Sequence, residues 1–505
     1  MKKSISAFLG FLLFSPGALA GGLGVFDGQS DIGSVNPAGT GSYNPATGDY
    51  TVTAAGSNIW ARVDNFHFLW KRMSGDLDLT ADIAFPPPSY SHAPDIHRKA
   101  VLMLRQRLDA GSIYADAALH GGGLTALQYR RGQGDNTQDI ELNIAAPRTL
   151  RLEKRGDVIT LFLSMKGELL HRVGASIKLH LDGDFYVGLG LSAHDPATTD
   201  KVIFSHVTLS LPGVEAAGAP LDHSTLQLIG TEDQLRRSTI LYTATGTFEA
   251  PNLMPGGKAL LINQDGHFLK IPLLDPLAGG APVPFDTGEA KGCWGEHGFS
   301  PDGKWFAISC STPDHKGPDV YIVPAAGGAP RQVTHQPVSF FRGWSPDGKL
   351  IVFASIRDGQ RQLYTVPAAG GPETRLTNEG QNDGAEYTPD GKYIYFNSDL
   401  SGLMQIWRMK PDGSDQEQIT SNDANNWYPH ISPDGKSIVF LSYDKDVAGH
   451  AQNKDVRLRI LTPDNGAIRT LVHLTGGQGS IDSPCWIDND HLAFVSYQSY
   501  PGGAP

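Results

Sequence analysis

A five-residue phrase recurs at a nearly constant interval in the second half of this chain. Ser-Pro-Asp-Gly-Lys occupies 300–304, 345–349 and 432–436, and Thr-Pro-Asp-Gly-Lys occupies 388–392. Successive copies begin 45, 43 and 44 residues apart. A fixed period of this size indicates a repeat architecture, in which one supersecondary unit is copied several times.

Each copy predicts a tight turn between two strands. Pro fixes φ at the second position of a type I turn, Asp tolerates the third position, and Gly supplies the fourth. A β-rich run follows every copy, at 305–308, 350–354, 393–396 and 437–441. Degenerate copies at 254–258 and 486–489 raise the number of predicted hairpins to six.

A third and a fourth strand follow the hairpin in each unit, most clearly within 320–334 and 363–377. Four strands per period and six periods predict a six-bladed β-propeller over residues 225–505. The last hairpin ends at Tyr497 without outer strands of its own. We expect 226–229 and 239–243 to supply them, which would close the ring and remove an open sheet edge.

The segment 21–212 shows no trace of this period and reads as about a dozen short alternating strands without a helical pattern. It predicts a two-sheet β-sandwich, so the whole chain is expected to be all-β. Residues 213–224 are rich in Gly, Ala and Pro and are predicted to be the linker between the two domains.

Polar side chains alternate along the predicted strands of the sandwich. One face would carry Arg105, Arg107, Tyr114, Asp116, His120, Gln128 and Arg130. These side chains would line a groove for an acidic or neutral glycan, or they would form the solvated face that an antiparallel sheet usually has.

The first 20 residues have the pattern of a secretory signal, with Lys2 and Lys3 before the apolar run 7–14 and a small-residue cleavage site at 18–20. That run is too short to span a membrane. The chain is therefore expected to be soluble, not membrane-spanning, and either periplasmic or secreted. A net charge of −12 argues against a nucleic-acid partner.

Three cysteines cannot all pair with one another. Cys293 and Cys310 flank the 300–304 turn symmetrically and should face each other across its hairpin. They would form a cross-strand disulfide in an oxidising compartment, or remain two buried thiols. Cys485 is expected to be a small core residue.

The repeated phrase and the strand pattern of 225–500 resemble the TolB-like propellers. The motifs at 58–60, 66–70 and 74–76 give the N-terminal segment a resemblance to concanavalin-like (laminin-G-like) sandwiches of exported bacterial proteins. Together these resemblances imply an exported binding protein. The protein that gives this family its name carries a small α/β domain before the propeller, whereas a β-sandwich is expected there in this chain.

The residues just before each Pro-Asp-Gly turn are expected to approach the central channel of the propeller. These are Glu249, Trp294, Glu296, His297, Arg342, Asp383, Glu386, Trp427, His430 and Asp482. Within this ligand-binding set, His297, His430 and Glu386 are the candidate ligands for a divalent cation such as Ca²⁺ or Mn²⁺. The alternative is a hydrated polar channel without a metal.

A polar insertion in the fifth unit, at 446–455, is longer than the corresponding loops of the other units. It carries His450, Lys454 and Asp455, and with His430 these are the residue types that general acid–base catalysis needs. Long polar loops on a rigid scaffold often bind ligands. Surface loops also carry such residues without a catalytic role.

Two functions follow from these features. The first is a non-catalytic extracytoplasmic protein that engages a glycan, an envelope polymer or a protein segment through the channel mouth and the sandwich. The second is a carbohydrate-active enzyme, a polysaccharide lyase or a glycoside hydrolase, because oligogalacturonate lyase is a propeller with similar repeats and a His-ligated metal. No Gly-x-Ser-x-Gly elbow, Walker loop or His-Glu-x-x-His motif is present.

Overall fold

The computed structural model describes residues 22–87, 95–142, 144–165, 170–211, 218–231, 237–274, 278–336 and 338–502. Every regular element in these ranges is a β-strand, which confirms the all-β fold class. None of the described segments forms a helix of the length and apolar character needed to cross a membrane. The predicted signal at 1–20 and residues 213–217 of the predicted linker lie outside the described ranges.

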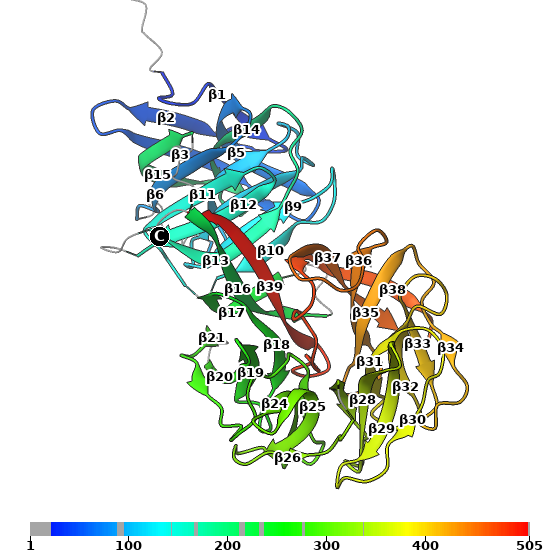
Figure 1. Ribbon diagram of the computed structural model, residues 1–505. Coiled ribbons are helices and arrows are strands. Elements are labelled where there is room, and N and C mark those ends of the chain that lie inside the picture. The colour runs from blue at the N-terminus through cyan, green and yellow to red at the C-terminus, as the bar shows by residue number, and fades with distance from the viewer. Residues whose placement is uncertain are drawn as a thin grey trace, which may run out of the picture.

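The N-terminal half is built from two sheets (Figure 1). The first sheet contains, from its outer edge, β1 (Gly28–Ile32), β5 (Val63–Met73), β14 (Phe185–Ser192), β7 (Lys99–Arg105), β8 (Tyr114–His120), β9 (Thr125–Arg130) and β10 (Gln138–Glu141), with β4 (Asn58–Trp60) paired to β5. The second contains β13 (His171–Lys178), β12 (Val158–Ser164), β11 (Thr149–Arg155), β6 (Leu77–Ala84), β15 (Asp195–Ser210), β3 (Asp49–Gly56) and β2 (Thr40–Asn44).

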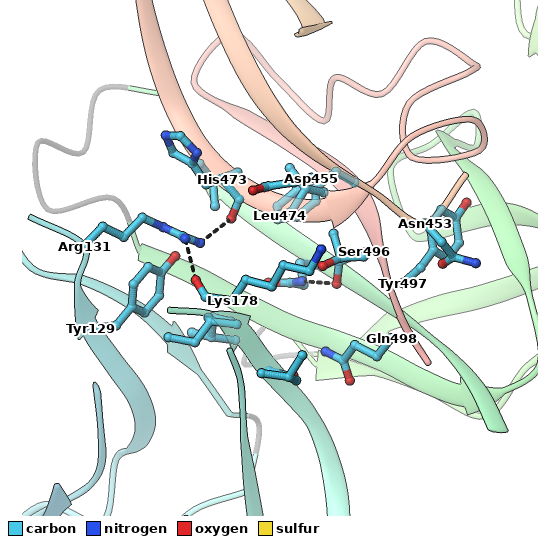
Figure 2. Close-up of a pocket in the computed structure, with 18 residues that line it drawn as sticks. Tyr129, Arg131, Lys178, Asn453, Asp455, His473, Leu474, Ser496, Tyr497 and Gln498 are labelled. Carbon is cyan, nitrogen blue, oxygen red and sulfur yellow. Dashed lines mark hydrogen bonds between the residues drawn. The ribbon is translucent and has the colours of Figure 1, made fainter. Parts of the chain in front are cut away.

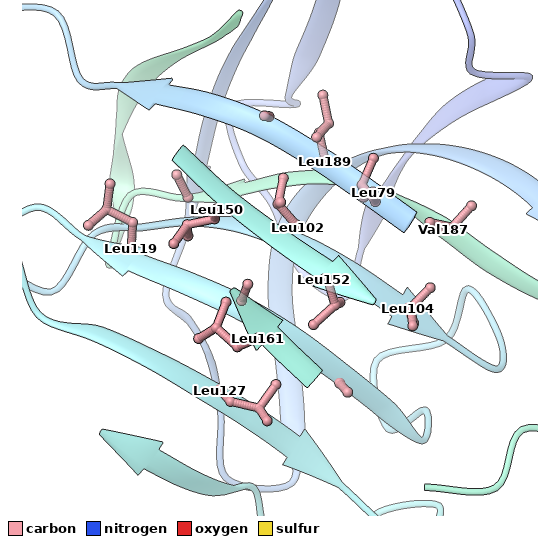
Figure 3. Close-up of a cluster of buried hydrophobic side chains, with 14 of the residues drawn as sticks. Leu79, Leu102, Leu104, Leu119, Leu127, Leu150, Leu152, Leu161, Val187 and Leu189 are labelled. Atoms are coloured by element: carbon pink, nitrogen blue, oxygen red, sulfur yellow. The ribbon is translucent and has the colours of Figure 1, made fainter. Parts of the chain in front are cut away.

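A core of aliphatic side chains fills the space between these two sheets. Leu102 and Leu189 belong to the first sheet, and Leu79, Leu152 and Leu161 belong to the second. Figure 3 shows these side chains gathered between the strands. All five are completely buried, so alternation along the strands places one apolar row of each sheet inward.

The opposite face of the first sheet is also buried. Its polar residues therefore form neither the predicted glycan groove nor the predicted solvated face. Tyr114, Asp116 and Arg130 have no exposed surface, and Gln128 and His120 are at most 4% exposed. Of the seven residues predicted for a groove or a solvated face, Arg107 alone is exposed, and it lies beyond the end of β7. Loop segments cover the face of the first sheet that the alternation of polar and apolar residues along its strands would place in solvent.

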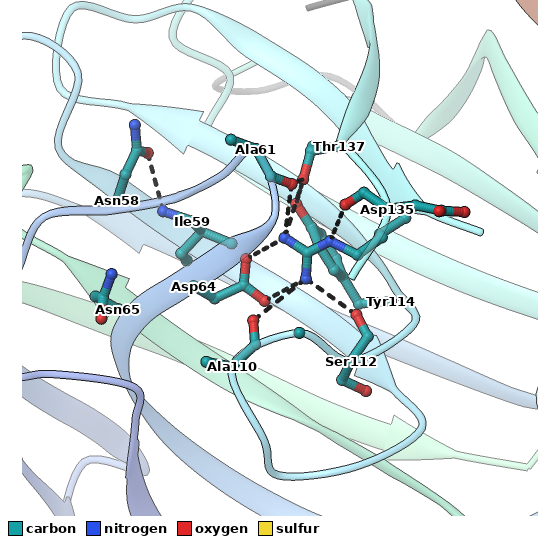
Figure 4. A network of polar contacts seen from close by, with 12 residues as sticks. Asn58, Ile59, Ala61, Asp64, Asn65, Ala110, Ser112, Tyr114, Asp135 and Thr137 are labelled. Atoms are coloured by element: carbon teal, nitrogen blue, oxygen red, sulfur yellow. Dashed lines mark hydrogen bonds and ion pairs between the residues drawn. The ribbon is translucent and has the colours of Figure 1, made fainter. Parts of the chain in front are cut away.

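A buried ion cluster on this face pairs three of its charged residues, Asp64, Arg105 and Arg130. Asp64 accepts two hydrogen bonds from Arg130, at 2.8 and 2.9 Å, and lies 3.5 Å from a nitrogen of Arg105. Arg130 also donates to the carbonyls of Ala61, Ser112 and Asp135. Figure 4 shows these groups turned toward one guanidinium. Asp64, Arg105 and Arg130 are thus paired with one another, as burial of charge in a low dielectric requires. Both carboxyl oxygens of Asp116 are buried without a hydrogen-bond partner, and burial raises the pKa of Asp116 well above its usual range.

The C-terminal half contains five smaller antiparallel sheets, each formed by consecutive strands. They are β18 (Phe248–Leu253) with β19 (Ala259–Gln264), β20 (His267–Leu274), β21 (Ala278–Gly279) and β22 (Val283–Pro284); β23 (His297–Phe299), β24 (Trp305–Thr312), β25 (His315–Pro324) and β26 (Arg331–Gln332); β27 (Ser339–Trp344), β28 (Leu350–Arg357), β29 (Gln360–Pro367) and β30 (Thr374–Arg375); β31 (Asn382–Tyr387), β32 (Ile394–Ser398), β33 (Gln405–Met409) and β34 (Glu417–Gln418); and β35 (Ala424–Ile431), β36 (Ile438–Asp444), β37 (Lys454–Thr462) and β38 (Ala467–Gly476).

The repeated phrase forms the turn between the first and second strands of four of these sheets. In the first copy the Ser300 hydroxyl donates to Asp302 at 2.7 Å and accepts from the amide of Trp305 at 3.0 Å. Gly303 adopts a φ of +66°, a left-handed conformation that favours glycine. The same contacts recur at 345–350, 388–393 and 432–437. The phrase is therefore a self-contained turn whose own side chains satisfy its backbone.

The strands at the two ends of the second half pair with each other. β39 (His491–Gly502) pairs with β16 (Gly218–Gly230), and β16 pairs with β17 (Arg237–Thr245). They include both segments that were predicted to complete the last hairpin. β16 begins at Gly218, so its first residues are strand, which corrects the predicted linker over 218–224.

These three strands do not form a separate sheet. β17 pairs in parallel with β10 of the N-terminal half, from Asp139 opposite Arg237 to Glu141 opposite Thr239. The first sheet therefore runs without a break through β17 and β16 to β39 and has 11 strands. The described residues thus form five separate propeller sheets, whereas six were predicted. Figure 1 shows β39 extending between the two halves.

Cys293 and Cys310 form a disulfide across the second of the small sheets, with their Cα atoms 4.0 Å apart. Of the two states left open by the sequence, the structure thus contains the bonded one. Cys485 is a buried free thiol.

Candidate functional site

A recurring irregularity shapes the first strands of three propeller sheets. The register of β18, β31 and β35 shifts just after Glu249, Asp383 and Trp427 respectively. The next residue in each case has a left-handed backbone, with φ of +56° at Ala250, +58° at Gly384 and +57° at Tyr428. A bulge of this kind bends the strand and re-aims its side chains.

An ion network joins Asp383 of β31 to residues of two neighbouring propeller sheets. The Arg342 guanidinium contacts Asp383 at 2.5 Å and Glu296 at 3.2 Å, and Arg361 forms a second ion pair with Asp383. Burial would raise the pKa of Asp383, but the charges of the two arginines outweigh it and hold that pKa well below its usual range. Asp383 is therefore a carboxylate clamped between two cations.

Three acidic side chains form a contrasting cluster beside this network. Burial, reinforced by the neighbouring Glu296, raises the pKa of Glu249 to about 7. Burial, together with Glu249 and Glu296, raises the pKa of Asp482 well above its usual range. One oxygen of Glu296 is buried without a hydrogen-bond partner. Because like charges and desolvation both oppose ionisation here, an incoming cation would relieve both penalties.

Two hollows open on the same rim of the propeller. The acidic hollow, of about 340 Å³, is lined by Thr247, Glu249, Asn263, Asp265, Gly266, Gln452 and Gln478. The arginine hollow, of about 420 Å³, is lined by Ile356, Gly359, Arg361, Gln381, Asp383, Asp399, Met404, Trp427, Gly449 and His450. Both lie where first strands begin and where second strands turn into third strands, which is the end opposite the Pro-Asp-Gly turns.

The polar insertion of the fifth unit lies between these hollows. It contributes His450 to the arginine hollow and Gln452 to the acidic hollow. The carbonyl of His450 accepts a hydrogen bond of 3.0 Å from the amide of Gln478. The His450 ring lies 3.1 Å from the Tyr428 hydroxyl and packs against Trp427 at 4.5 Å between centroids. Burial lowers the pKa of His450 to about 4, so its ring is neutral at pH 7.

The structure does not assemble the predicted metal site. His430 contacts Glu386 at 2.6 Å, and its other ring nitrogen faces the carbonyl of Ile481 at 2.5 Å. His297 is fully buried against Phe268 and Phe306, and burial lowers its pKa to about 3. Within the part of the chain that is described, no group of three or more His, Cys, Asp or Glu side chains is placed to hold a metal ion.

The predicted acid–base set is also dispersed. His430 is engaged with Glu386, and His450 belongs to the arginine hollow. Lys454 and Asp455 are exposed at the start of β37, and Asp455 lines a different cavity, between the N-terminal half and the propeller. Trp294, the remaining predicted residue, is half-buried and packs edge-on against Phe340 at 6.3 Å.

Arg361 and Tyr428 are two residues of the site that the predicted set did not include. Arg361 follows the turn between the second and third strands of its sheet, whereas the prediction considered first strands only. Tyr428 lies at a strand bulge, and its ring is 5.6 Å from the Arg342 guanidinium. The Asp358-Gly359 turn signal before Arg361 was readable in the sequence, since it marks the same rim as Asp265-Gly266.

The sequence and the fold of this chain were compared with those of known proteins. Residues 286–384 and 338–466 match the model of the TolB β-propeller domain. An uncharacterised protein of Agrobacterium fabrum, Atu1656, is 44% identical over 265 residues, which are 52% of this chain and 89% of that protein. An Agrobacterium tumefaciens structure that carries a provisional TolB name is 41% identical, covers 56% of this chain and 99% of its own, and has a TM-score of 0.52.

A more distant match is to oligogalacturonate lyase from Vibrio parahaemolyticus. It is 14% identical, with 52% of this chain and 75% of the lyase covered and a TM-score of 0.32, and no argument rests on it. The Agrobacterium relatives, in contrast, match over nearly their whole length. The chain therefore belongs to the TolB-like β-propeller family.

Proposed function

We propose that this chain is an exported, non-catalytic binding protein that captures an extended protein segment across the channel mouth of its propeller. The observation that carries the proposal is a pair of hollows on one rim, one lined by the carboxyl group of Glu249 and the other by the guanidinium of Arg361. A single insertion contributes residues to both hollows. An extended segment that crosses both hollows would meet an unpaired carboxylate in one and a guanidinium in the other.

The acidic hollow is suited to a lysine or arginine side chain. Glu249 lines it, and its pKa of about 7 leaves it partly protonated near neutral pH. A bound cation would favour the ionised carboxylate and would offset the repulsion from Glu296 and Asp482. The amide side chains of Gln452 and Gln478 supply hydrogen-bonding groups for a peptide backbone.

The arginine hollow is suited to an acidic or carbonyl group next to an aromatic wall. Arg361 is about one-quarter exposed, so it keeps donors accessible while it holds Asp383. Trp427 and Met404 provide apolar contact area in the same hollow. Aromatic residues and arginine are the residue types that contribute most to protein–protein recognition.

The internal pairing of the channel charges favours recognition over catalysis. Arg342 is occupied by Asp383 and Glu296, and both nitrogens of His430 have oxygen neighbours. Side chains held in this way give a rigid surface, which lowers the entropic cost of binding a partner.

Further parts of the proposal concern architecture and location. The strands β39, β16 and β17 act as the sixth blade and close the ring, while the two-layer N-terminal half is a concanavalin-like sandwich. The signal pattern at 1–20 supports export to the periplasm or beyond. An envelope protein is the favoured partner, because the polar face once considered for a glycan is buried.

Selection from a library of unstructured 12-residue peptides tests this function. We expect enriched peptides that carry Lys or Arg, and we expect Glu249→Gln to weaken their binding by about tenfold, because it removes a buried charge partner. The control is Glu289→Gln, which changes an exposed glutamate outside both hollows. No enrichment, or equal affinity of the two variants, would overturn the proposal.

A further inference from the structure

A third cavity lies where the two halves of the chain meet. It has a volume of about 190 Å³. Arg131, Val158, Ile177 and Lys178 line it from the sandwich, and Asp455, Val472, His473, Leu474, Phe494 and Gln498 line it from the propeller strands. Figure 2 shows Tyr129 and Arg131 at one end, with Lys178 extended along the cavity. Neither half forms this cavity alone.

The walls of this junction cavity are held in place by specific contacts between the two halves. The Arg131 guanidinium donates to the carbonyl of Lys178 at 2.5 Å and to the carbonyl of His473 at 3.3 Å. Gln498 donates to the carbonyl of Gly174 at 2.7 Å. The parallel pairing of β10 with β17 fixes the same junction through backbone hydrogen bonds. The cavity is thus preformed.

The floor of the junction cavity is apolar. Ile140, Ile177, Val472, Leu474 and Phe494 line it, and each is at most 7% exposed. An apolar cavity of about 150 Å³ is large enough to hold benzene. The junction cavity is somewhat larger, so it accommodates a compact body of about one ring with a small substituent.

The junction cavity has two cationic donors that are not used by the protein, one at the Arg131 end and one on the Lys178 side chain that extends along it. The Nε atom of Arg131 is buried without a hydrogen-bond partner. Among the described residues, the Lys178 ammonium has no partner either, although Lys178 extends into the cavity. Unused donors next to an apolar floor are complementary to an anion on an apolar body.

We propose that the junction cavity is a binding site for a compact amphipathic anion, a carboxylate carried on a body of about one ring. The carboxylate would accept hydrogen bonds from Lys178 and from Nε of Arg131, and the apolar body would pack on Leu474 and Phe494. Asp455 lies at the cavity wall and disfavours a second negative charge, which selects a monoanion. This site is separate from the channel mouth.

Calorimetric titration of the full chain with sodium benzoate tests the proposal, with benzyl alcohol and benzylamine as neutral and cationic probes of the same shape. We expect one saturable benzoate site with a Kd of about 1 mM or tighter, and binding about tenfold weaker or worse for the other two probes. No saturable benzoate binding, or benzylamine binding as tight as benzoate, would overturn the proposal.

Variants locate the site. Lys178→Gln should weaken benzoate binding by about fivefold or more because a charge-assisted contact is lost, whereas Lys201→Gln, on an exposed strand position elsewhere, should leave it unchanged. Leu474→Trp should fill the cavity and abolish binding; if it does not fold, Ile177→Phe serves the same purpose. Benzoate binding that survives both Lys178→Gln and the cavity-filling change would also overturn the proposal.

Discussion

Replacement of Asp64 by Asn should be among the most damaging single changes in the sandwich. Asp64 is completely buried and accepts two hydrogen bonds from Arg130, at 2.8 and 2.9 Å, beside a 3.5 Å contact with Arg105. Asn keeps the shape and removes the charge, so two buried guanidiniums lose their shared counter-charge. Breaking a buried pair on one side costs about 3–5 kcal/mol.

The remaining contacts place the expected cost at the lower end of that range. Arg130 keeps four carbonyl acceptors and Arg105 keeps the carbonyls of Arg107 and Asp109. We therefore expect a loss of about 3 kcal/mol, which lowers the melting temperature of a domain of this size by about 6–12 °C. Differential scanning calorimetry of the full chain measures this shift in the transition that includes the sandwich.

Asp135→Asn is the matched control for Asp64→Asn. The Asp135 side chain is exposed, and this residue contacts Arg130 through its backbone carbonyl only. The same chemical change should therefore cost less than about 0.5 kcal/mol. If Asp64→Asn melts within a degree or so of the control, the buried cluster does not stabilise the sandwich in the way described.

Three further predictions concern the propeller. Glu249 has a folded-state pKa of about 7 against an ordinary value of 4.5, so the folded chain binds extra protons between these pH values and its stability falls as pH rises through that window. Urea titrations of Glu249→Gln should lack this fall, and the variant should be more stable than the parent by up to about 3 kcal/mol at pH 8. Parallel pH profiles of parent and variant would contradict this prediction. Joint replacement of Cys293 and Cys310 by Ala should cost about 3 kcal/mol, because the disulfide closes a loop with a sequence separation of 17; an unchanged urea midpoint would count against it. Gly348→Ala should cost about 1–2 kcal/mol from backbone strain alone, since φ is +68° and the new methyl group would meet no atom closer than 3.9 Å; thermal denaturation equal to that of the parent would refute this.

The sequence was sufficient for the parts of the fold that repeat. The Pro-Asp-Gly phrase predicts the turns because Ser300 and Asp302 satisfy the turn backbone locally, without help from the rest of the chain. That 226–229 and 239–243 join the sheet of the C-terminal strand was also predictable, since the last hairpin lacked outer strands. Local periodicity and local hydrogen bonds carry this information.

The candidate site was only partly predictable. Asp383, Glu249 and Trp427 were expected on the first strands, but the left-handed residues that follow them include Ala250 and Tyr428, which no composition rule marks as bulges. The side-chain directions at the channel therefore depend on the ring of sheets. His297 and His430 were predicted to share a metal site, but the His297 ring packs against Phe268 and Phe306. The alternation of residues along a strand does not say which side of that strand packs on a neighbouring sheet.

The sequence by itself determined the all-β class, the repeated turns and the acidic character of the chain, because these depend on neighbouring residues and on composition. Tertiary structure alone decided that the polar face around Arg130 is buried and that β10 pairs with β17. It also decided that the insertion at 446–455 borders the acidic hollow, the arginine hollow and the junction cavity. Each of these depends on segments far apart in sequence. A polar residue is tolerated inside when a distant partner such as Asp64 pairs with it, and no local pattern records where that partner lies.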